Sequence, residues 1–284
     1  MKLGFLGIGL MGRPMTLRLL ATGHDVTVWN RSRDKLAPVL AEGAREADSP
    51  AAVARAVEIV LMCVTDHRAA EEVLFGRGGV IEGAQRGMMV VDFSSIPPAS
   101  ARDFSRRLAE KGIGLVDAPV SGGVPGAEKG TLAIMAGGRE EDVERVRPVV
   151  MHLAARFTRM GESGAGQTTK LCNQIIVGSL LPVIAEAIRL AEAAGVDATK
   201  LPEALKGGFA DSLPLQIFGA RMASRTFEPS IGAAALMLKD LSNAAAVAAE
   251  RGIELPMVQR ALERYRQLKL AGGIDREPSV LVEL

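Results

Sequence analysis

The chain has 284 residues, of which 48% are hydrophobic and 24% are charged, a composition typical of a globular protein of one large or two ordinary domains. The formal net charge of +1 excludes a long-range field that would attract nucleic acid or an acidic membrane. Two cysteines and three histidines without metal-motif spacing exclude a disulfide framework and make a zinc site improbable. We therefore expect no nucleic-acid partner, no membrane partner and no metal.

The sequence also indicates a compartment. The first residues lead directly into a strand-like run, so we expect no signal peptide. The longest apolar stretch, Ile175 to Ala185, is too short to span a bilayer. Cys63 and Cys172 both lie in apolar runs, which predicts that they are buried. We expect a cytoplasmic protein.

In the first half of the chain, short apolar runs alternate with helical patterns. The strand-like runs are Leu3–Leu6, Asp25–Asn30, Val57–Val64, Met88–Asp92, Ile113–Asp117 and Leu132–Ala136. Helical periodicity occupies Pro14–Ala21, Asp34–Ala41 and Ala101–Lys111. Nearly continuous apolar strands separated by helices predict a parallel sheet buried on both faces, and hence a doubly wound α/β domain.

The second half of the chain has no strand pattern. Residues 167–194 predict one long helix, apolar nearly all round, that Gly195 ends as a C-cap. We expect burial on several sides of this helix, along a domain junction and a subunit interface. Three or four further helices follow, over Leu201–Phe209, Leu213–Met222, Gly232–Arg251 and Pro256–Ala271. The best boundary lies at Gly161–Gly166, which gives domains 1–163 and 164–284.

A glycine-rich turn follows the first predicted strand. Gly7, Gly9 and Gly12 form the pattern G-x-G-x-x-G between the strand and a helix. The first glycine permits a tight turn, the second lets backbone approach a pyrophosphate, and the third lets the helix pack on the strand. The helix N-terminus offers N–H groups to the phosphates. An unliganded turn is the alternative, but the context favours a dinucleotide site formed by Gly7, Ile8, Gly9, Leu10, Met11, Gly12 and Val64.

The residues after the second strand distinguish between cofactors. NAD sites usually place an acidic side chain there to bind the ribose hydroxyls, whereas this chain has Asn30, Arg31 and Ser32. Arg31 is suited to pair with a 2′-phosphate, and Ser32 to hydrogen-bond to it. We therefore predict a preference for NADP(H), with NAD(H) possible. The alternative is that Arg31 and Arg33 belong to a solvated turn.

Two polar turns follow later strands. Asp92–Ser95 closes one strand and Asp117–Gly123 closes another, and both lie at carboxyl ends, where open α/β sheets bind ligands. Ser121, Gly122 and Gly123 supply a hydroxyl and consecutive unhindered N–H groups, which suit a small carboxylate. An ordinary glycine turn is the alternative interpretation.

Near its start the long helix carries Lys170, with Asn173 and Gln174 about one turn further along. A lysine among apolar residues is a candidate general acid/base because burial lowers its pKa from about 10.4. A solvated lysine is the simpler alternative. Two histidines are less suited to this role, since His24 precedes the second strand and His152 is expected in a helix that ends the first domain.

These motifs together resemble the β-hydroxyacid dehydrogenase family, which includes 3-hydroxyisobutyrate dehydrogenases and tartronate semialdehyde or glyoxylate reductases. The similarity covers nearly the whole chain. It rests on four segments in order: Gly4–Gly12 with Gly23-His24 and Asn30-Arg31; Asp117–Gly123 continuing to Leu132; Gly164-x-Gly166-x-x-x-Lys170-x-x-Asn173; and Lys239-Asp240-Leu241.

The resemblance implies a Rossmann domain joined by a long helix to an all-α domain, assembled as a homodimer or homotetramer. It implies that Lys170 is the acid/base and that Ser121, Gly122 and Gly123 hold the carboxylate of a small aldehyde or hydroxyacid substrate. Asn173 or Gln174 would orient the substrate, in place of the two consecutive asparagines of many members. Ser95 would lie beside the nicotinamide, where members usually have threonine. Lys239 would approach the cofactor and the substrate.

Three other functions are compatible with parts of the pattern. Imine reductases share the fold, but they usually have another residue at the position of Lys170. A 6-phosphogluconate dehydrogenase shares the lysine but has a much longer chain. A non-catalytic NADP-binding module usually lacks the lysine that is present here.

Overall fold

The computed structural model describes all residues of the chain, Met1–Leu284. The chain packs as two compact units, Met1–Lys170 and Leu171–Leu284. The predicted domain boundary between residues 163 and 164 stays a prediction.

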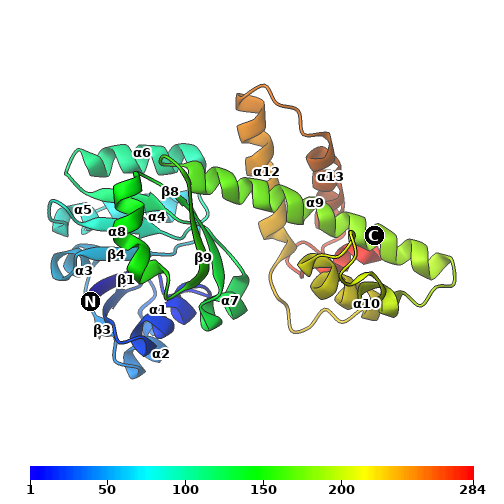
Figure 1. The fold of residues 1–284 in the computed structure, drawn as a ribbon, viewed down its shortest axis with the longest axis horizontal. Helices are drawn as coiled ribbons and strands as arrows, with labels where there is room; N and C mark the ends of the chain where they lie inside the picture. The colour runs from blue at the N-terminus through cyan, green and yellow to red at the C-terminus, as the bar shows by residue number, and fades with distance from the viewer. The chain divides into compact units, whose positions relative to one another are not determined.

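The first unit is built on a nine-stranded sheet (Figure 1). The strand order is β3-β2-β1-β4-β5-β6-β8-β7, with β9 paired to β8. The pairs from β3 to β6 and the β8–β9 pair are parallel, whereas β8 runs antiparallel to β6 and β7. The strands are β1 (Lys2–Leu6), β2 (Asp25–Trp29), β3 (Arg45–Glu46), β4 (Ile59–Met62), β5 (Met89–Asp92), β6 (Gly114–Asp117), β7 (Val120–Ser121), β8 (Leu132–Gly137) and β9 (Ala154–Gly161).

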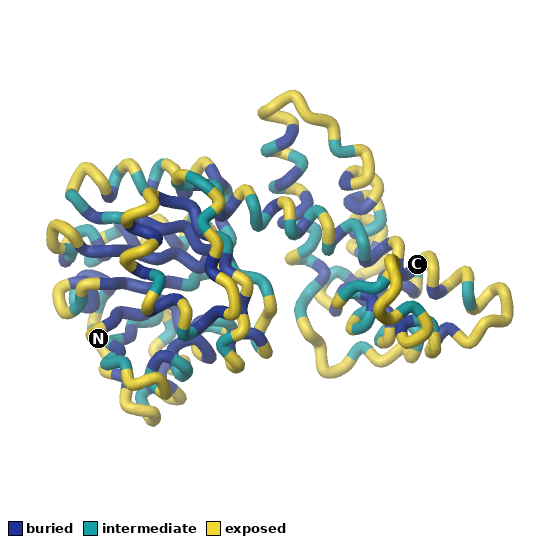
Figure 2. Tube along the Cα trace, viewed as in Figure 1, coloured by how far each residue is buried: buried dark blue, intermediate teal, exposed yellow.

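Helices cover both faces of this sheet, as predicted (Figure 1). Leu3 and Phe5 point into a core shared with α1 and α8, whereas Leu6 points into a second core with α3, α4 and α6. The central strands β4 and β5 are therefore buried at every residue (Figure 2). The helices are α1 (Gly12–Ala21), η1 (Arg33–Leu36), α2 (Ala37–Ala41), α3 (Pro50–Ala56), α4 (His67–Phe75), α5 (Val80–Gly83), α6 (Pro98–Ala109), α7 (Gly123–Lys129) and α8 (Glu140–Val150).

The six predicted strands are confirmed as β1, β2, β4, β5, β6 and β8, and the doubly wound class with them. The sequence missed the two-residue strands β3 and β7 and the longer strand β9. The prediction that His152 lies in a helix is wrong: it lies in the turn between α8 and β9. There its ring contacts the His24 ring, with centroids 4.9 Å apart.

The second unit contains helices only, as predicted. Its core joins α9 to α12 and α13 through Leu181, Ile188, Leu241 and Tyr265. Gly195, at φ +76°, follows the end of α9 in the left-handed conformation expected of a glycine C-cap. The elements are α9 (Ala165–Ala193), which begins in the first unit, η2 (Ala198–Lys200), α10 (Leu201–Leu205), η3 (Leu215–Gly219), α11 (Ala220–Ser224), α12 (Ala234–Glu250), α13 (Pro256–Leu270) and η4 (Pro278–Glu283).

One face of α9 is exposed in the single chain. Ile176, Val183 and Leu190 are 68%, 49% and 71% exposed, so this face is not buried by the chain itself. Cys172 is also exposed, which corrects the prediction that both cysteines are buried. By length and composition α9 could cross a membrane, although 44% of its most apolar window is buried, and core helices of soluble proteins share these properties.

Candidate active site

The glycine-rich loop after β1 has the geometry that its pattern predicts. A Cβ on Gly7, at φ +94°, would lie 2.3 Å from the Cys63 carbonyl oxygen, and one on Gly12 would lie 1.9 Å from the Gly7 carbonyl oxygen. A Cβ on Gly9, by contrast, would have no atom within 4 Å. Gly7 and Gly12 are therefore required by packing, whereas Gly9 leaves open space at the turn, as a closely approaching pyrophosphate needs.

Asn30 closes this loop from the end of β2. Its side-chain Oδ1 accepts a hydrogen bond from the Ile8 N–H at 2.8 Å, and its Nδ2 donates to the Ser32 carbonyl at 2.8 Å. The Ile8 side chain is buried in the core, at 2% exposure. Asn30 therefore fixes the shape of the loop, and Ile8 contributes a backbone donor that is already bound within it.

A cleft runs along the carboxyl ends of β1, β2 and β4. Arg33 is paired with Glu46 at 2.7 Å, so Arg31 and Lys35 are the basic residues that line the cleft. Lys35 was missed by the sequence interpretation, although it lies one turn beyond Arg31 in the same basic segment. The cleft is lined by Gly7, Gly9, Leu10, Met11, Gly12, Trp29, Asn30, Arg31, Ser32, Lys35, Cys63, Val64, Thr65, Ala69, Glu72 and Val73.

Buried polar groups fix the turn after β5. Asp92 accepts a hydrogen bond from the Ser94 N–H at 2.8 Å, and the Ser94 hydroxyl accepts one from the Val64 N–H at 2.9 Å. Burial raises the pKa of Asp92 to about 7, although hydrogen bonds from Ser94 act to lower it. The hydrogen bond between Val64 and Ser94 joins the turn that carries Ser95 to the turn that carries Val64, and Val64 lines the cleft.

The start of α9 is anchored to the carboxyl end of β6. Asp117 accepts hydrogen bonds from the Gly164 N–H at 2.7 Å and the Gln167 N–H at 3.0 Å. Burial raises the pKa of Asp117 to about 6, so the group is mostly ionised at neutral pH and interacts favourably with the helix N-terminus. A Cβ on Gly166 would lie 2.5 Å from the Asp117 carbonyl oxygen, so only glycine permits this close approach.

Gln167 connects the same helix to β5. Its Nε2 donates to the Ser94 carbonyl at 2.7 Å, and its Oε1 accepts from the Ile96 N–H at 3.1 Å. The backbone on both sides of Ser95 is therefore held by one amide. Lys170 is partly buried and follows Gln167 by three residues, which places it on the same side of α9. The sequence interpretation missed Gln167, although its i,i+3 spacing to Lys170 was visible.

The turn after β7 has the backbone that its glycines predict. Gly122 and Gly123 have φ values of +126° and +61°, and Ser121 is partly exposed at the end of β7. This turn begins four residues after Asp117, the residue that anchors α9. The carboxyl end of β6 therefore leads into the turn expected to bind a carboxylate, and it also holds the start of the helix that carries Lys170.

In the second unit, a polar chain joins α9 to α12. Asn173 Nδ2 donates to Gln174 Oε1 at 2.8 Å, and Gln174 Nε2 donates to Asp240 Oδ2 at 2.7 Å. Lys239 Nζ lies 3.5 Å from Asp240 Oδ1. Gln174 and Asp240 are buried, whereas Asn173 and Lys239 are partly exposed. The sequence had singled out the other three residues and left Asp240 without a role.

Other reactive side chains are structurally engaged. Burial raises the pKa of the Cys63 thiol to about 12, so it stays protonated at neutral pH. The single tyrosine, Tyr265, is buried and donates to the Gly178 carbonyl at 3.1 Å, and burial raises its pKa as well. No group of three or more His, Cys, Asp and Glu side chains is arranged to hold a metal ion. Lys170 is thus the acid/base candidate at the carboxyl edge of the sheet.

Family models match both units of the chain. Residues 2–161 match the model of the NAD binding domain of 6-phosphogluconate dehydrogenase. Residues 164–284 match that of the NAD-binding domain of NADP-dependent 3-hydroxyisobutyrate dehydrogenase. The chain is 40% identical, over 100% of its own length and 96% of the relative's, to the 2-hydroxy-3-oxopropionate reductase of Escherichia coli K12.

Solved structures show the same relationship. Mycobacterium tuberculosis 3-hydroxyisobutyrate dehydrogenase with L-serine has a TM-score of 0.90 at 29% identity, over 99% of this chain and 98% of that one. A Streptomyces aurantiacus imine reductase has a TM-score of 0.67 at 22% identity, over 100% and 99%, a likeness of fold alone. The family models and relatives show that the chain is an NAD(P)-binding oxidoreductase of the class that acts on CH–OH groups. Within that class, the chain belongs to the β-hydroxyacid dehydrogenase family.

Proposed function

We propose that this protein is an NADP(H)-dependent reductase of small semialdehydes or 2-oxoacids, and a dehydrogenase of the corresponding hydroxyacids, with Lys170 as general acid/base. The candidate substrates are tartronate semialdehyde, glyoxylate, succinic semialdehyde and 3-hydroxyisobutyrate. The observation that carries the proposal is the anchoring of the helix with Lys170 to the turns after β5 and β6 by Gln167 and Asp117.

The loop geometry fits a bound dinucleotide. Gly9 leaves room for the pyrophosphate, and Arg31 and Lys35 supply positive charge where a 2′-phosphate would lie. Glu72 also lines the cleft and brings one negative charge. When bound, the cofactor supplies or accepts the hydride. We assign cofactor contacts to the glycine-rich loop, Asn30, Arg31, Ser32, Val64, Ser95 and Lys239.

The remaining steps belong to side chains of the protein. The Ser121–Gly123 turn binds the substrate carboxylate through the Ser121 hydroxyl and backbone N–H groups, which fixes the orientation of the carbonyl. The Lys170 ammonium stabilises the developing negative charge on the carbonyl oxygen and donates a proton to it. In the oxidative direction neutral Lys170 removes the hydroxyl proton. Gln167 is hydrogen-bonded to the backbone on both sides of Ser95 and precedes Lys170 by three residues on α9. It therefore keeps Ser95 close to the part of α9 that carries Lys170.

The direct test is an NADPH-consumption screen. Purified protein is mixed with glyoxylate, succinic semialdehyde, tartronate semialdehyde and methylmalonate semialdehyde, and oxidation of 3-hydroxyisobutyrate is followed with NADP⁺ and with NAD⁺. Turnover of at least one carboxylate-bearing substrate is expected. Turnover of a cyclic imine alone would instead favour an imine reductase, and NADPH binding without any turnover would favour a non-catalytic module.

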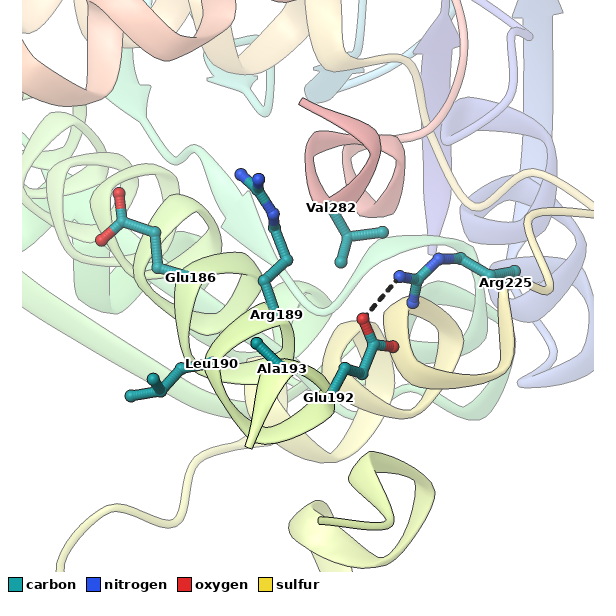
Figure 3. A pocket seen from close by; sticks show the side chains of 7 residues that line it. All are labelled: Glu186, Arg189, Leu190, Glu192, Ala193, Arg225 and Val282. Atoms are coloured by element: carbon teal, nitrogen blue, oxygen red, sulfur yellow. Dashed lines mark hydrogen bonds and ion pairs between the residues drawn. The ribbon is translucent and has the colours of Figure 1, made fainter. Parts of the chain in front are cut away.

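We also propose that the exposed face of α9 packs against a second copy of the chain in a homodimer or homotetramer. Ile176, Val183 and Leu190 are seven residues apart, so they form one apolar line along the helix. Leu190, at the end of this line, borders a hollow that Glu192 and Arg225 also line. There Arg225 Nη2 pairs with Glu192 Oε2 at 2.8 Å, and the Leu190 side chain points away from this ion pair (Figure 3). This hollow carries no group of the proposed chemistry.

The oligomer is tested by light scattering during gel filtration. The wild-type protein is expected to run as a dimer or tetramer, and Val183→Asp is expected to shift it towards the monomer. Leu270→Asp, at an 89% exposed position outside the line, is the matched control. A monomeric wild-type protein at micromolar concentration would contradict the proposal. Fractionation of the source cells tests the expected cytoplasmic location.

A further inference from the structure

Glu72 is the one acidic side chain that lines the cofactor cleft. It lies on α4, whereas the cations Arg31 and Lys35 belong to the segment after β2. The Glu72 carboxylate makes no ion pair with either cation and no other hydrogen bond within the chain. The cleft therefore presents a carboxylate whose oxygens are available to a ligand, although the ligand that it binds is itself an anion.

Three residues of α4 line the cleft, and their spacing puts them on one side of the helix. Ala69, Glu72 and Val73 are three and four residues apart, so two apolar side chains and a carboxylate form one surface. Glu72 lies about 8 Å along the helix axis from the first residue of α4, which follows the end of β4 beside Gly7. This surface is therefore separate from the pyrophosphate position and suits the base of the dinucleotide.

A carboxylate pairs only with a donor, and the adenosine half of NADP(H) has few of them. Its phosphate groups and the ring nitrogens of its adenine are acceptors. The ribose lies where the chain leaves β2, at Asn30 and Ser32, which is the usual place of ribose recognition in this fold. The exocyclic amino group is the remaining donor, and it lies at the polar edge of a base whose faces are apolar.

We propose that Glu72 is a specificity-determining residue that accepts a hydrogen bond from the exocyclic amino group of adenine, and so selects an adenine dinucleotide over one with a 6-oxopurine base. This inference rests on the proposed function and adds base recognition to its cofactor site. A 6-oxopurine presents a carbonyl oxygen at the same position, where two acceptors repel each other. The residues of this contact all belong to the first unit.

The end of α4 leaves room for the Glu72 carboxylate. A Cβ on Gly76 would lie 2.5 Å from Glu72 Oε1, so glycine lets this side chain lie against the backbone. The neighbouring acidic residue faces another helix: Glu71 Oε1 accepts a hydrogen bond from Arg107 Nη1 of α6 at 2.8 Å. Of two consecutive glutamates, one is therefore bound between helices and the other is presented to the cleft.

The experiment measures the dissociation constants of NADPH and of its hypoxanthine analogue, in which a carbonyl oxygen replaces the amino group, with no substrate present. Both dinucleotides carry the fluorescent reduced nicotinamide. Trp29, the single tryptophan of the chain, lines the cleft and reports binding independently. For the wild type we expect NADPH to bind about fivefold more tightly, because the analogue replaces a charge-assisted hydrogen bond at an exposed side chain by a repulsion.

Glu72→Gln and Glu72→Ala separate base recognition from other effects of the side chain. Each removes the acceptor-only group, so the ratio of the two dissociation constants is expected to fall to about one. Glu72 is exposed on a helix, where both replacements are compatible with the fold, and thermal melts check this. Glu71→Gln removes the same charge one residue away, and this matched control is expected to keep the wild-type ratio.

A wild-type protein that binds both dinucleotides equally overturns the inference, and so does a Glu72→Gln variant that keeps the wild-type ratio. If Glu72→Ala changes both affinities equally, the carboxylate acts on the phosphates or the ribose, and the inference is overturned as well. All three results leave the proposed function standing. Failure of the wild type to bind NADPH, or to turn over any substrate of the screen, contradicts the proposed function itself.

Discussion

The cofactor cleft in the first unit and the polar chain in the second place their functional groups by different means. In the cleft, backbone geometry dominates: Gly7 and Gly12 are required because any side chain would meet a carbonyl oxygen. In the polar chain, side chains dominate: Gln174 reaches Asp240 across 66 residues of sequence. The comparison shows that a site made of backbone leaves a local signature, whereas a site made of side-chain contacts depends on the tertiary fold.

Substitutions of the glycines are expected to have the largest effect, because they test whether backbone geometry forms the cofactor cleft. Gly12→Ala places a methyl group on the Gly7 carbonyl, so we expect loss of stability and a decrease in kcat/KM of more than about 100-fold. Gly9→Ala meets no protein atom and should melt like the wild type while binding NADPH more weakly. Thermal melts and NADPH fluorescence titrations check both. Equal stability of the two variants would contradict the assigned roles.

Arg31 tests whether the cleft selects NADPH by charge. Arg31→Ala should lower kcat/KM with NADPH by about 10- to 100-fold and change that with NADH little, because a charge-assisted contact to the 2′-phosphate is lost. Arg33→Ala is the matched control, since Arg33 is bound to Glu46. Steady-state kinetics with both cofactors decide the matter. A wild-type preference for NADH would refute the cofactor assignment.

Gln167 makes side-chain contacts within the first unit, and removing them tests whether side chains also position groups there. Gln167→Leu leaves the Ser94 carbonyl and the Ile96 N–H without their partner, so we expect a decrease in kcat of about tenfold. The NADPH dissociation constant should change little. Gln259→Leu, at an exposed site on α13, controls for loss of an amide. An unchanged kcat would show that the hydrogen bonds of Gln167 to Ser94 and Ile96 do not position Lys170.

Asp92 is expected to affect stability alone. Burial raises its pKa to about 7, against about 3.9 for an exposed aspartate. Between these values the folded state holds a proton that the unfolded state releases, so the free energy of unfolding falls as pH rises, by at most about 1.4 kcal/mol per unit. Relative to wild type, Asp92→Asn should gain stability from pH 4 to 7 and level off by pH 8. Urea melts that show a pH-independent difference would contradict this.

The sequence predicted the parts of the fold whose signal is local. β1, β4 and β5 are continuous apolar runs because both of their faces are buried. β9 was missed because its buried residues, Ala154 and Phe157, are three apart and follow no period of two, and because it carries two arginines, Arg156 and Arg159. β3 and β7 have two residues each, too few for any periodicity.

The candidate site divides in the same way. Lys170 and the Ser121–Gly123 turn were identified from their motifs. The residues that hold them, Asp117 and Gln167, act through contacts across 47 to 73 residues of sequence, which no local pattern shows. Either Asn173 or Gln174 was expected to orient the substrate. Gln174 is buried and bound to Asp240, so Asn173 is the more accessible of the two.

The central claim is that the Lys170 amine transfers the proton. The most direct measurement is kcat of Lys170→Ala on the best semialdehyde of the screen, made on protein shown by fluorescence titration to bind NADPH like the wild type. The account predicts a decrease of about 10²- to 10⁴-fold with cofactor affinity retained. A variant that keeps wild-type kcat would contradict it.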